Sequence, residues 1–282
     1  MWVAILGTGK MGAAMAKRLA AQGHQLKLWN RTRSRAEAVG VGQVSPTPAD
    51  AVRDADAVIS MLTDAAAVRA AYLGPDGAVK AAHDQVFADM STAGADVEQE
   101  IRAALPAFVE APVLGSVGAI LNGTAVVLVG GKKETVERAQ PVLEAFGEVR
   151  LIGELGSASA LKLIANTMLA GVYALTSELM AAGVAAGLPP EDVFFVLNRT
   201  APLLTQRKAG FVEHRYEPVT FALRDMLKDL ELAHQTFSRL GVSTPLSEDS
   251  RRLFEKAATT HADAEVSAVA SLYEGEWARS PR

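Results

Sequence analysis

The first twelve residues constrain the fold more than any other stretch of the chain. Val3–Leu6 form a short apolar run that predicts a buried parallel strand. Gly7, Gly9 and Gly12 follow in the order G-x-G-x-x-G, and the residues after them keep the apolar spacing of a helix. A strand, a glycine-rich turn and a helix in this order predict the opening unit of a sheet with helices on both faces.

Each glycine has its own physical role in such a turn. Gly7 permits the tight turn, Gly9 lets the backbone approach a pyrophosphate, and Gly12 lets the helix pack closely on the strand. The helix N-terminus then offers N–H groups and a positive dipole end to the phosphates. The pattern favours a dinucleotide site over a glycine-rich turn that only packs. Its candidate cofactor contacts are Gly7, Thr8, Gly9, Lys10, Met11 and Gly12.

The end of the predicted second strand, residues 25–29, bears on the choice of cofactor. An acidic residue there would accept a hydrogen bond from the ribose 2′-hydroxyl of NAD, but Asn30 is neutral. Arg31, Thr32 and Arg35 follow, and guanidinium and hydroxyl groups suit a 2′-phosphate. We therefore predict NADP as the cofactor, with NAD less favoured. The alternative is the solvated basic start of a helix.

Strand and helix patterns alternate through the first half of the chain. Apolar runs predict further strands at 57–62, 86–89, 107–111 and 125–129. This alternation predicts an α/β fold, with a doubly wound Rossmann sheet in residues 1–153. Ligands bind beyond the carboxyl ends of such strands. The candidate cofactor contacts near those ends are Met61, Leu62, Thr63, Val68 and Thr92.

The strand patterns stop near Gly153. From there apolar residues keep helical spacing and predict a long helix over 157–186. This helix would leave the first domain and begin an all-α domain in residues 154–282. Further helices are expected at 191–197, 221–240, 247–259 and 264–274.

Composition and charge narrow the classes of function. The net charge of −4 gives no electrostatic case for nucleic acid, and the absence of cysteine excludes disulfides and thiol catalysis. Five histidines without paired spacing predict no metal site. The long apolar helix carries Lys162, Asn166 and Glu178, so no run is expected to span a membrane. Because the chain opens on a strand, we expect no signal peptide and a cytoplasmic location.

Two polar side chains in the long helix are the candidate catalytic residues. Lys162 and Asn166 are one helical turn apart, so they lie on the same side. A lysine there can act as the general acid/base of hydride transfer, because its ammonium stabilises and protonates a carbonyl oxygen. Asn166 can orient substrate oxygens. The alternative is a snorkelling lysine beside an incidental asparagine, and spacing does not decide between the two.

A second charged pair, Lys228 and Asp229, lies on a later predicted helix. Together with Phe221 and Asp225 these residues share a broad helical face. On the residues alone, a solvated charged face is the favoured interpretation.

Together these motifs resemble the β-hydroxyacid dehydrogenase family, which includes 3-hydroxyisobutyrate dehydrogenases and glyoxylate and semialdehyde reductases. The likeness runs nearly end to end. Gly7–Gly12 looks like the cofactor signature, and residues 89–92 look like the serine-threonine turn. The substrate-binding segment is similar to 110–116, the catalytic segment to 156–166, and the late lysine-aspartate motif to 228–230.

The resemblance implies an NAD(P)-dependent enzyme that interconverts a small hydroxyacid or alcohol with a semialdehyde or ketone. It implies Lys162 as the catalytic lysine, Thr92 on the nicotinamide side, Lys228 as a cofactor contact, and a homodimer or homotetramer. Imine reduction on the same scaffold and a non-catalytic NADP-binding module are the alternatives. The implied substrate contacts are Ser91, Leu114, Gly115, Ser116, Asn166, Phe221 and Asp229.

Three positions depart from the family pattern. Leu114 stands where the family usually has a serine, Ala158 replaces a glycine, and no proline follows Thr92. An apolar side chain at 114 cannot donate a hydrogen bond to a carboxylate, although Ser116 lies two positions on. The substrate is therefore expected to be less polar than hydroxyisobutyrate, or to bind differently.

Overall fold

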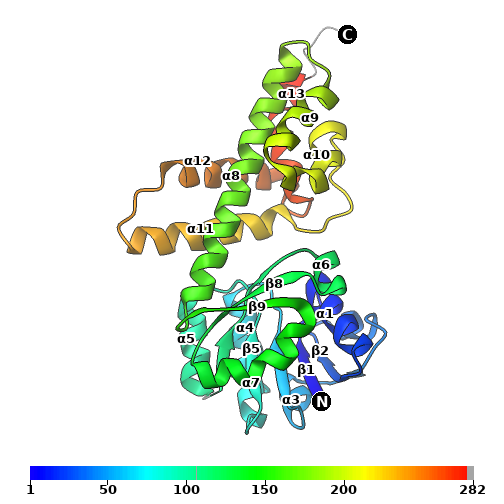
Figure 1. Cartoon of the computed structure of the whole chain (residues 1–282), viewed down its shortest axis with the longest axis vertical. Helices are drawn as coiled ribbons and strands as arrows, with labels where there is room; N and C mark the ends of the chain where they lie inside the picture. The colour runs from blue at the N-terminus through cyan, green and yellow to red at the C-terminus, as the bar shows by residue number, and fades with distance from the viewer. Residues whose placement is uncertain (106, 278–282) are drawn as a thin grey trace. The chain divides into compact units, whose positions relative to one another are not determined.

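The computed structural model describes residues 1–105 and 107–277, and the chain divides into two compact units. Met1–Lys162 form the first unit, and the second begins at Leu163. The division falls inside helix α8 (Ser157–Ala185), a single helix of 29 residues, and not before it at residue 153. The long helix predicted from apolar spacing is therefore present, and residues of both units belong to it (Figure 1).

The described part of the first unit holds a nine-stranded sheet. Its order is β3-β2-β1-β4-β5-β6-β8-β7, and β9 pairs with β8. The first six strands in that order run parallel, whereas β8 is antiparallel to β6 and β7. This arrangement confirms the predicted doubly wound Rossmann topology. The strands are β1 (Trp2–Leu6), β2 (Gln25–Trp29), β3 (Gln43–Val44), β4 (Ala57–Ser60), β5 (Val86–Asp89), β6 (Phe108–Glu110), β7 (Val113–Leu114), β8 (Ala125–Gly130) and β9 (Gly147–Gly153).

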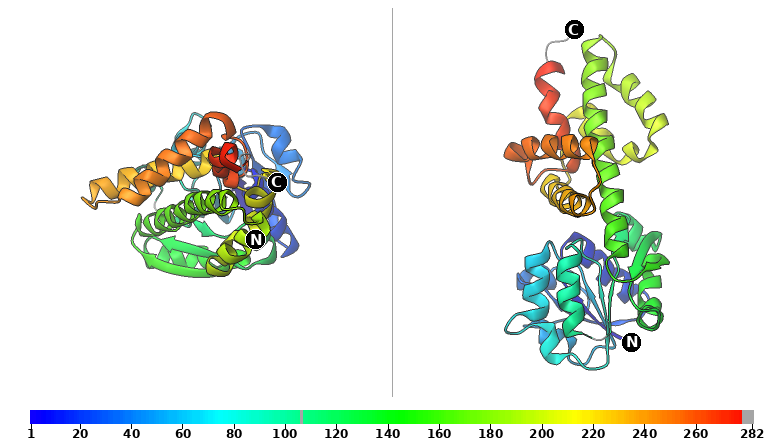
Figure 2. Two further views of the ribbon diagram at one scale, coloured as in Figure 1. Left: turned by 90° about the horizontal axis from the view of Figure 1, so that it is seen from above. Right: turned by 90° about the vertical axis from the view of Figure 1, so that its left-hand side faces the viewer.

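Helices cover both faces of this sheet (Figures 1 and 2). In β1, Val3 and Ile5 belong to one apolar core, while Ala4 and Leu6 belong to the other. All four are fully buried, as expected for a strand covered on both faces. The first core includes side chains from α1 (Lys10–Ala21), α2 (Arg33–Glu37), α6 (Val117–Asn122) and α7 (Lys133–Leu143). The second includes side chains from α3 (Pro48–Val52), α4 (Ala65–Leu73) and α5 (Ala95–Ala104).

The second unit is helical in its described residues. Its core gathers large apolar side chains such as Tyr173, Phe211 and Phe254. Helices α11 and α12 lie side by side (Figures 1 and 2). The segment predicted as a helix at 264–274 is mostly a 3-10 helix, η4 (Val266–Tyr273). The other helices are α9 (Pro190–Thr200), η3 (Pro202–Arg207), α10 (Lys208–Glu213), α11 (Leu223–Arg239), α12 (Pro245–His261) and α13 (Glu274–Trp277).

Helix α8 bears on the expectation that no run of this chain spans a membrane. By length and composition it is apolar enough to cross a membrane, although it carries Lys162 and Asn166. This is weak support for a membrane span, because Tyr173 and Met180 of the same helix lie in the helical core. Core helices of soluble proteins meet the same criterion.

Candidate active site

The glycine-rich turn after β1 has the geometry that its sequence predicts. Gly7 has a φ of +100°, and a Cβ there would collide with the Met61 carbonyl oxygen. A Cβ on Gly12 would collide with the Gly7 carbonyl oxygen, so α1 approaches the turn closely. At Gly9, in contrast, a Cβ would meet no atom of the described residues within 4 Å apart from its chain neighbours, and no side chain caps the start of α1 there. Open space in front of an uncapped helix start fits the phosphates of a dinucleotide.

Asn30 joins the end of β2 to this turn. Its Oδ1 accepts a hydrogen bond from the Thr8 N–H at 3.1 Å, and its Nδ2 donates to the Thr32 carbonyl at 3.0 Å. The side chains of Arg31 and Arg35 are exposed just beyond. The structure thus brings the predicted pyrophosphate and ribose contacts together at one edge of the sheet.

A buried chain of hydrogen bonds joins the ends of β4 and β5. The hydroxyls of Ser60 and Ser91 both donate to Asp89 Oδ1 at 2.6 Å, and Ser91 Oγ accepts from the Leu62 N–H at 2.8 Å. Burial raises the pKa of the Asp89 carboxyl. Ser91 is fully buried, so in this structure its hydroxyl fixes the turn, and its contact with substrate stays a prediction.

The other predicted cofactor contacts near these strand ends differ in accessibility. Met61, Leu62 and Thr92 are partly buried beside the turn, and Thr63 is exposed. Val68 is fully buried in the core formed with α3, α4 and α5. A direct contact between Val68 and a cofactor therefore has no support from this geometry.

Lys162 meets the predicted substrate segment within the first unit. Its Nζ donates a hydrogen bond to the Val113 carbonyl oxygen at 2.9 Å, and Val113 directly precedes Leu114. Gly115 and Ser116 follow, and Ser116 Oγ accepts from the Ala119 N–H at 3.3 Å as the N-cap of α6. The lysine and the segment on which substrate recognition was predicted are thus neighbours, although 49 residues separate Lys162 from Val113.

The polar candidates of the second unit form a cluster of their own. Asn166 Nδ2 donates to Asp229 Oδ2 at 2.6 Å, and Lys228 Nζ lies 2.7 Å from Asp229 Oδ1. Asn166 and Asp229 are only 7% and 4% exposed. The solvated charged face favoured from the residues alone is therefore wrong for Asp229. Phe221 stands just before α11, and its N–H donates to Glu265.

Sequence reasoning assigned no role to two buried acids of the first unit, Glu98 and Glu110. Both side chains are fully buried. The Glu110 carboxylate accepts three backbone N–H groups at the start of α8. In the sequence, Glu110 stands out only as the first residue of the segment that resembles the family's substrate-binding segment. The available signal was an ionisable residue in a buried strand, because burial of an acid requires partners.

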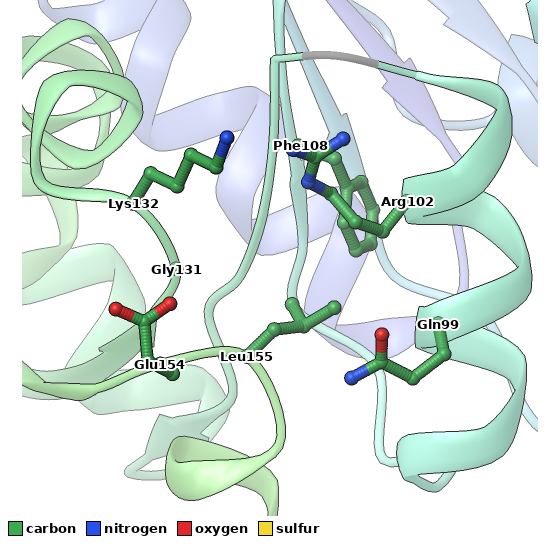
Figure 3. Close-up of a pocket in the computed structure, with 7 residues that line it drawn as sticks. All are labelled: Gln99, Arg102, Phe108, Gly131, Lys132, Glu154 and Leu155. Carbon is green, nitrogen blue, oxygen red and sulfur yellow. The ribbon is translucent and has the colours of Figure 1, made fainter.

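A cavity of about 200 Å³ lies elsewhere in the first unit (Figure 3). Gln99 and Arg102 extend into it from α5, while Lys132 and Glu154 face them from the other side. None of the predicted site residues lines it. The lining residues are Gln99, Arg102, Phe108, Gly131, Lys132, Glu154 and Leu155.

Comparison with known families and proteins agrees with the fold described above. Residues 2–156 match the NAD-binding domain of 6-phosphogluconate dehydrogenase, and residues 156–273 match the NAD-binding domain of NADP-dependent 3-hydroxyisobutyrate dehydrogenase. The glycine turn, the sheet and these matches define an NAD(P)-dependent oxidoreductase. The chain belongs to the 3-hydroxyisobutyrate dehydrogenase-like family of hydroxyacid dehydrogenases.

Individual relatives support the same assignment. Glyoxylate/succinic semialdehyde reductase 2 of Arabidopsis thaliana is 28% identical, over 90% of this chain and 74% of that protein. An uncharacterized oxidoreductase of Shewanella frigidimarina is 31% identical, over 87% of this chain and 88% of that protein. The structure of 3-hydroxyisobutyrate dehydrogenase from Mycobacterium tuberculosis has a TM-score of 0.82 at 29% identity, covering 96% of this chain and 98% of that one.

Two other similarities carry less weight, one because the chain spans only part of the relative and one because the sequence identity is low. The nuclear factor N-PAC of Mus musculus is 27% identical over 96% of this chain, but the chain spans only half of that protein. An imine reductase from Myxococcus stipitatus has a TM-score of 0.65 at 17% identity, covering 97% of this chain and all of that one. The second similarity shows a common fold alone.

Proposed function

We propose that this oxidoreductase uses NADP and interconverts a small semialdehyde or ketone with the corresponding hydroxyacid or alcohol, with Lys162 as the general acid/base. The observation that carries the proposal is the hydrogen bond of 2.9 Å from Lys162 Nζ to the Val113 carbonyl, beside Leu114. The same unit of the chain holds the glycine-rich turn. When bound, the nicotinamide cofactor supplies or accepts the hydride.

The role of Lys162 follows from its chemistry and its position. An ammonium group donates hydrogen bonds to the oxygen of a carbonyl substrate, stabilises the negative charge that develops there and delivers a proton. In the reverse direction the neutral amine takes that proton back. The bond to the Val113 carbonyl orients the amine before substrate arrives, which lowers the entropic part of the barrier. Asn166 is the second catalytic candidate, and Asp229 holds its amide in place.

The preference for NADP rests on the residues after β2. Asn30 carries no negative charge, so it does not repel a 2′-phosphate, and its side chain is committed to Thr8 and Thr32. The exposed guanidinium groups of Arg31 and Arg35 are suited to bidentate bonds with phosphate oxygens. Lys228 is proposed as a further cofactor contact.

The proposed substrate is a small carbonyl compound, less polar at one end than hydroxyisobutyrate. Leu114 presents an apolar side chain beside the carbonyl that holds Lys162, and the Ser116 hydroxyl already caps α6. Gly115 and backbone groups near it remain the proposed polar contacts. The relatives named as semialdehyde reductases support this class of substrate.

The protein is further proposed to act in the cytoplasm as a homodimer or homotetramer. Apolar side chains of α8 such as Met168 and Leu175, which are 67% and 55% exposed, support association through the helical unit. Sedimentation at increasing protein concentration tests this part of the proposal, and a monomer throughout would contradict it.

Initial rates test the central proposal. NADPH and NADH are each combined with glyoxylate, succinic semialdehyde and tartronate semialdehyde, and the oxidised cofactors with hydroxyisobutyrate. We expect turnover that favours NADPH, and a fall of about 10²–10⁴-fold in kcat for Lys162→Met, as for other general acid/base residues. Cofactor affinity of the variant, measured by NADPH fluorescence, should not change. Full turnover by Lys162→Met would rule out the assigned role.

Imine reduction is the second candidate, because imine reductases share the fold. Lys162 disfavours it, since this position resembles the catalytic lysine of hydroxyacid dehydrogenases. Cyclic imines in the same assay discriminate between the two reactions. Binding of NADPH without oxidation by any carbonyl or imine would instead favour a non-catalytic module.

A further inference from the structure

We propose that Glu110 is a positioning residue for Lys162: its buried carboxylate fixes the first turn of α8 and thereby the place of the lysine amine. This inference rests on the proposed function in one respect, namely that Lys162 is the acid/base. The Glu110 carboxylate accepts hydrogen bonds from backbone N–H groups at the start of α8, so its proposed effect on the amine passes through the helix.

The carboxylate binds three backbone N–H groups at the start of α8. Oε1 accepts from Gly156 at 2.7 Å and from Ala158 at 2.8 Å, and Oε2 accepts from Ser159 at 3.3 Å. The first N–H groups of a helix have no partner within the helix, and the dipole there favours a negative charge. The first turn of α8 contains no acidic residue of its own. Glu110, at the end of β6, supplies the missing anion.

The neighbouring strand leaves room for this carboxylate. Gly130 of β8 pairs with Glu110 in the sheet. A Cβ on Gly130 would collide with Glu110 Oε1 and would lie 2.9 Å from its Cδ. Any larger residue at 130 would therefore push the carboxylate away from the helix. Glycine at position 130 therefore leaves the space that the Glu110 carboxylate occupies.

A second contact holds α8 from the same short segment. Three residues after Glu110, the Val113 carbonyl accepts the hydrogen bond from Lys162 Nζ at 2.9 Å. Residues 110–113 thus bind the helix at its first turn and again at the lysine. Because both contacts come from one segment, the amine and the backbone that carries it are fixed relative to the same part of the sheet.

A second buried acid, Glu98, also lies at the start of α8. Burial is the main cause that raises the pKa of Glu98 well above its usual value, and a hydrogen bond to Glu110 raises it further. Glu98 Oε1 also accepts from Ser159 Oγ at 2.7 Å. Both acids thus contact the start of α8, Glu110 through backbone N–H groups and Glu98 through the Ser159 hydroxyl.

The variant Glu110→Gln tests this inference because it preserves shape and removes the charge. A displacement of about 1 Å at a reacting group can cost on the order of 10²-fold in rate, so we expect kcat to fall about 10-fold or more. The affinity for NADPH should stay as in the wild type. The primary isotope effect with 4-deuterated NADPH should rise, because hydride transfer becomes slower relative to product release.

A second readout needs no turnover. In the protein without substrate, Lys162 is acylated by a limiting amine reagent, and its labelling rate is compared with other lysines by mass spectrometry. We expect faster labelling of Lys162 in Glu110→Gln, because the amine is held less firmly at Val113. Gly130→Ala should act in the same direction, since it displaces the carboxylate without removing it.

Glu100→Gln is the matched control. This variant likewise replaces a carboxylate by an amide, but Glu100 lies on α5, is exposed and pairs with Arg69 at 2.7 Å. It should change none of the readouts. Wild-type kcat and labelling in both Glu110→Gln and Gly130→Ala would overturn the inference, as would a lower kcat with unchanged isotope effect and labelling. Absence of turnover in the wild type would count against the proposed function, while the labelling comparison would still test Glu110.

Discussion

The starts of α1 and α8 in the first unit differ in whether an acid of the protein binds their N–H groups. Neither α1 nor α8 has an acidic residue in its first turn. At α8 the Glu110 carboxylate binds three N–H groups. At α1 no side chain caps the helix, and the space at Gly9 is open. One helix start is thus completed by an anion of the protein, whereas the other fits an anion from outside.

The contrast separates a structural use of a helix N-terminus from a binding use. Both follow from the unpaired N–H groups and the dipole at a helix start. What differs is whether a buried acid of the same unit lies within reach. A helix start without such an acid, facing open space, is therefore the better candidate for a phosphate site. Variants of the two helix starts and of the residues around them test this distinction.

Gly9→Asp should give α1 the kind of internal anion that α8 has. Gly9 is the N-cap with extended backbone, a position where Asp is favoured, so the fold should be as stable as the wild type. The new carboxylate competes with the phosphates for the helix N–H groups and repels them. We expect a loss of about 100-fold in NADPH affinity by fluorescence titration, the equivalent of about 2.7 kcal/mol.

Gly9→Ala is the control for size without charge. Its Cβ would meet no protein atom within 4 Å, so any loss of affinity reports the close approach of a ligand. Unchanged NADPH affinity in both variants would place the cofactor away from this helix start.

Removing the arginines after β2 tests whether they bind the 2′-phosphate of NADPH. We expect the double variant Arg31→Ala, Arg35→Ala to raise the KM for NADPH about 10-fold and to leave that for NADH unchanged, because only NADPH carries the 2′-phosphate. Arg33→Ala is the matched control, since Arg33 pairs with Glu37 at 2.8 Å. An equal rise for both cofactors would contradict the NADP preference.

Glu98→Gln tests the protonation of the buried acid beside Glu110 and should have the smallest effect. The quantity measured is the pH dependence of the unfolding free energy. The pKa of Glu98 is raised on folding, so the native state keeps a proton that the unfolded chain loses above pH 4.5. The contribution of Glu98 to the unfolding free energy is therefore fully present below that pH and is lost as pH rises, by at most about 1.4 kcal/mol per pH unit for one proton. Urea titrations between pH 4.5 and 8 should show a shallower fall in Glu98→Gln. An identical slope would mean that Glu98 is ionised in the native state.

Local sequence patterns were sufficient for much of the fold. The apolar run before Gly7 predicted β1, and the alternation of strands and helices predicted the doubly wound sheet, since burial on both faces requires such runs. Apolar spacing predicted α8 to within a residue at each end. Strands β3 and β7 were missed because two residues carry no periodicity.

The residues of the site also fall into two groups, those in local motifs and those whose partners are distant in sequence. The glycine turn and the residues after β2 are local motifs, and the structure brings them together as predicted. Lys162 was found from an ammonium group in an apolar helix and from the family resemblance. The burial of Asp229 was missed because its partner Asn166 is 63 residues away. The complete burial of Val68 was likewise invisible in a pattern of single residues.

From the amino-acid order alone came the class of fold, the phosphate-binding turn and the identity of the candidate acid/base. Those features depend on residues within one strand, turn or helix, where spacing determines which side chains share a face. The partner of each helix start depended on three-dimensional packing. Glu110 reaches α8 across 46 residues, and its place in an apolar strand does not indicate which helix its carboxylate binds. Folding alone brings that carboxylate to one helix and leaves the space before the other open.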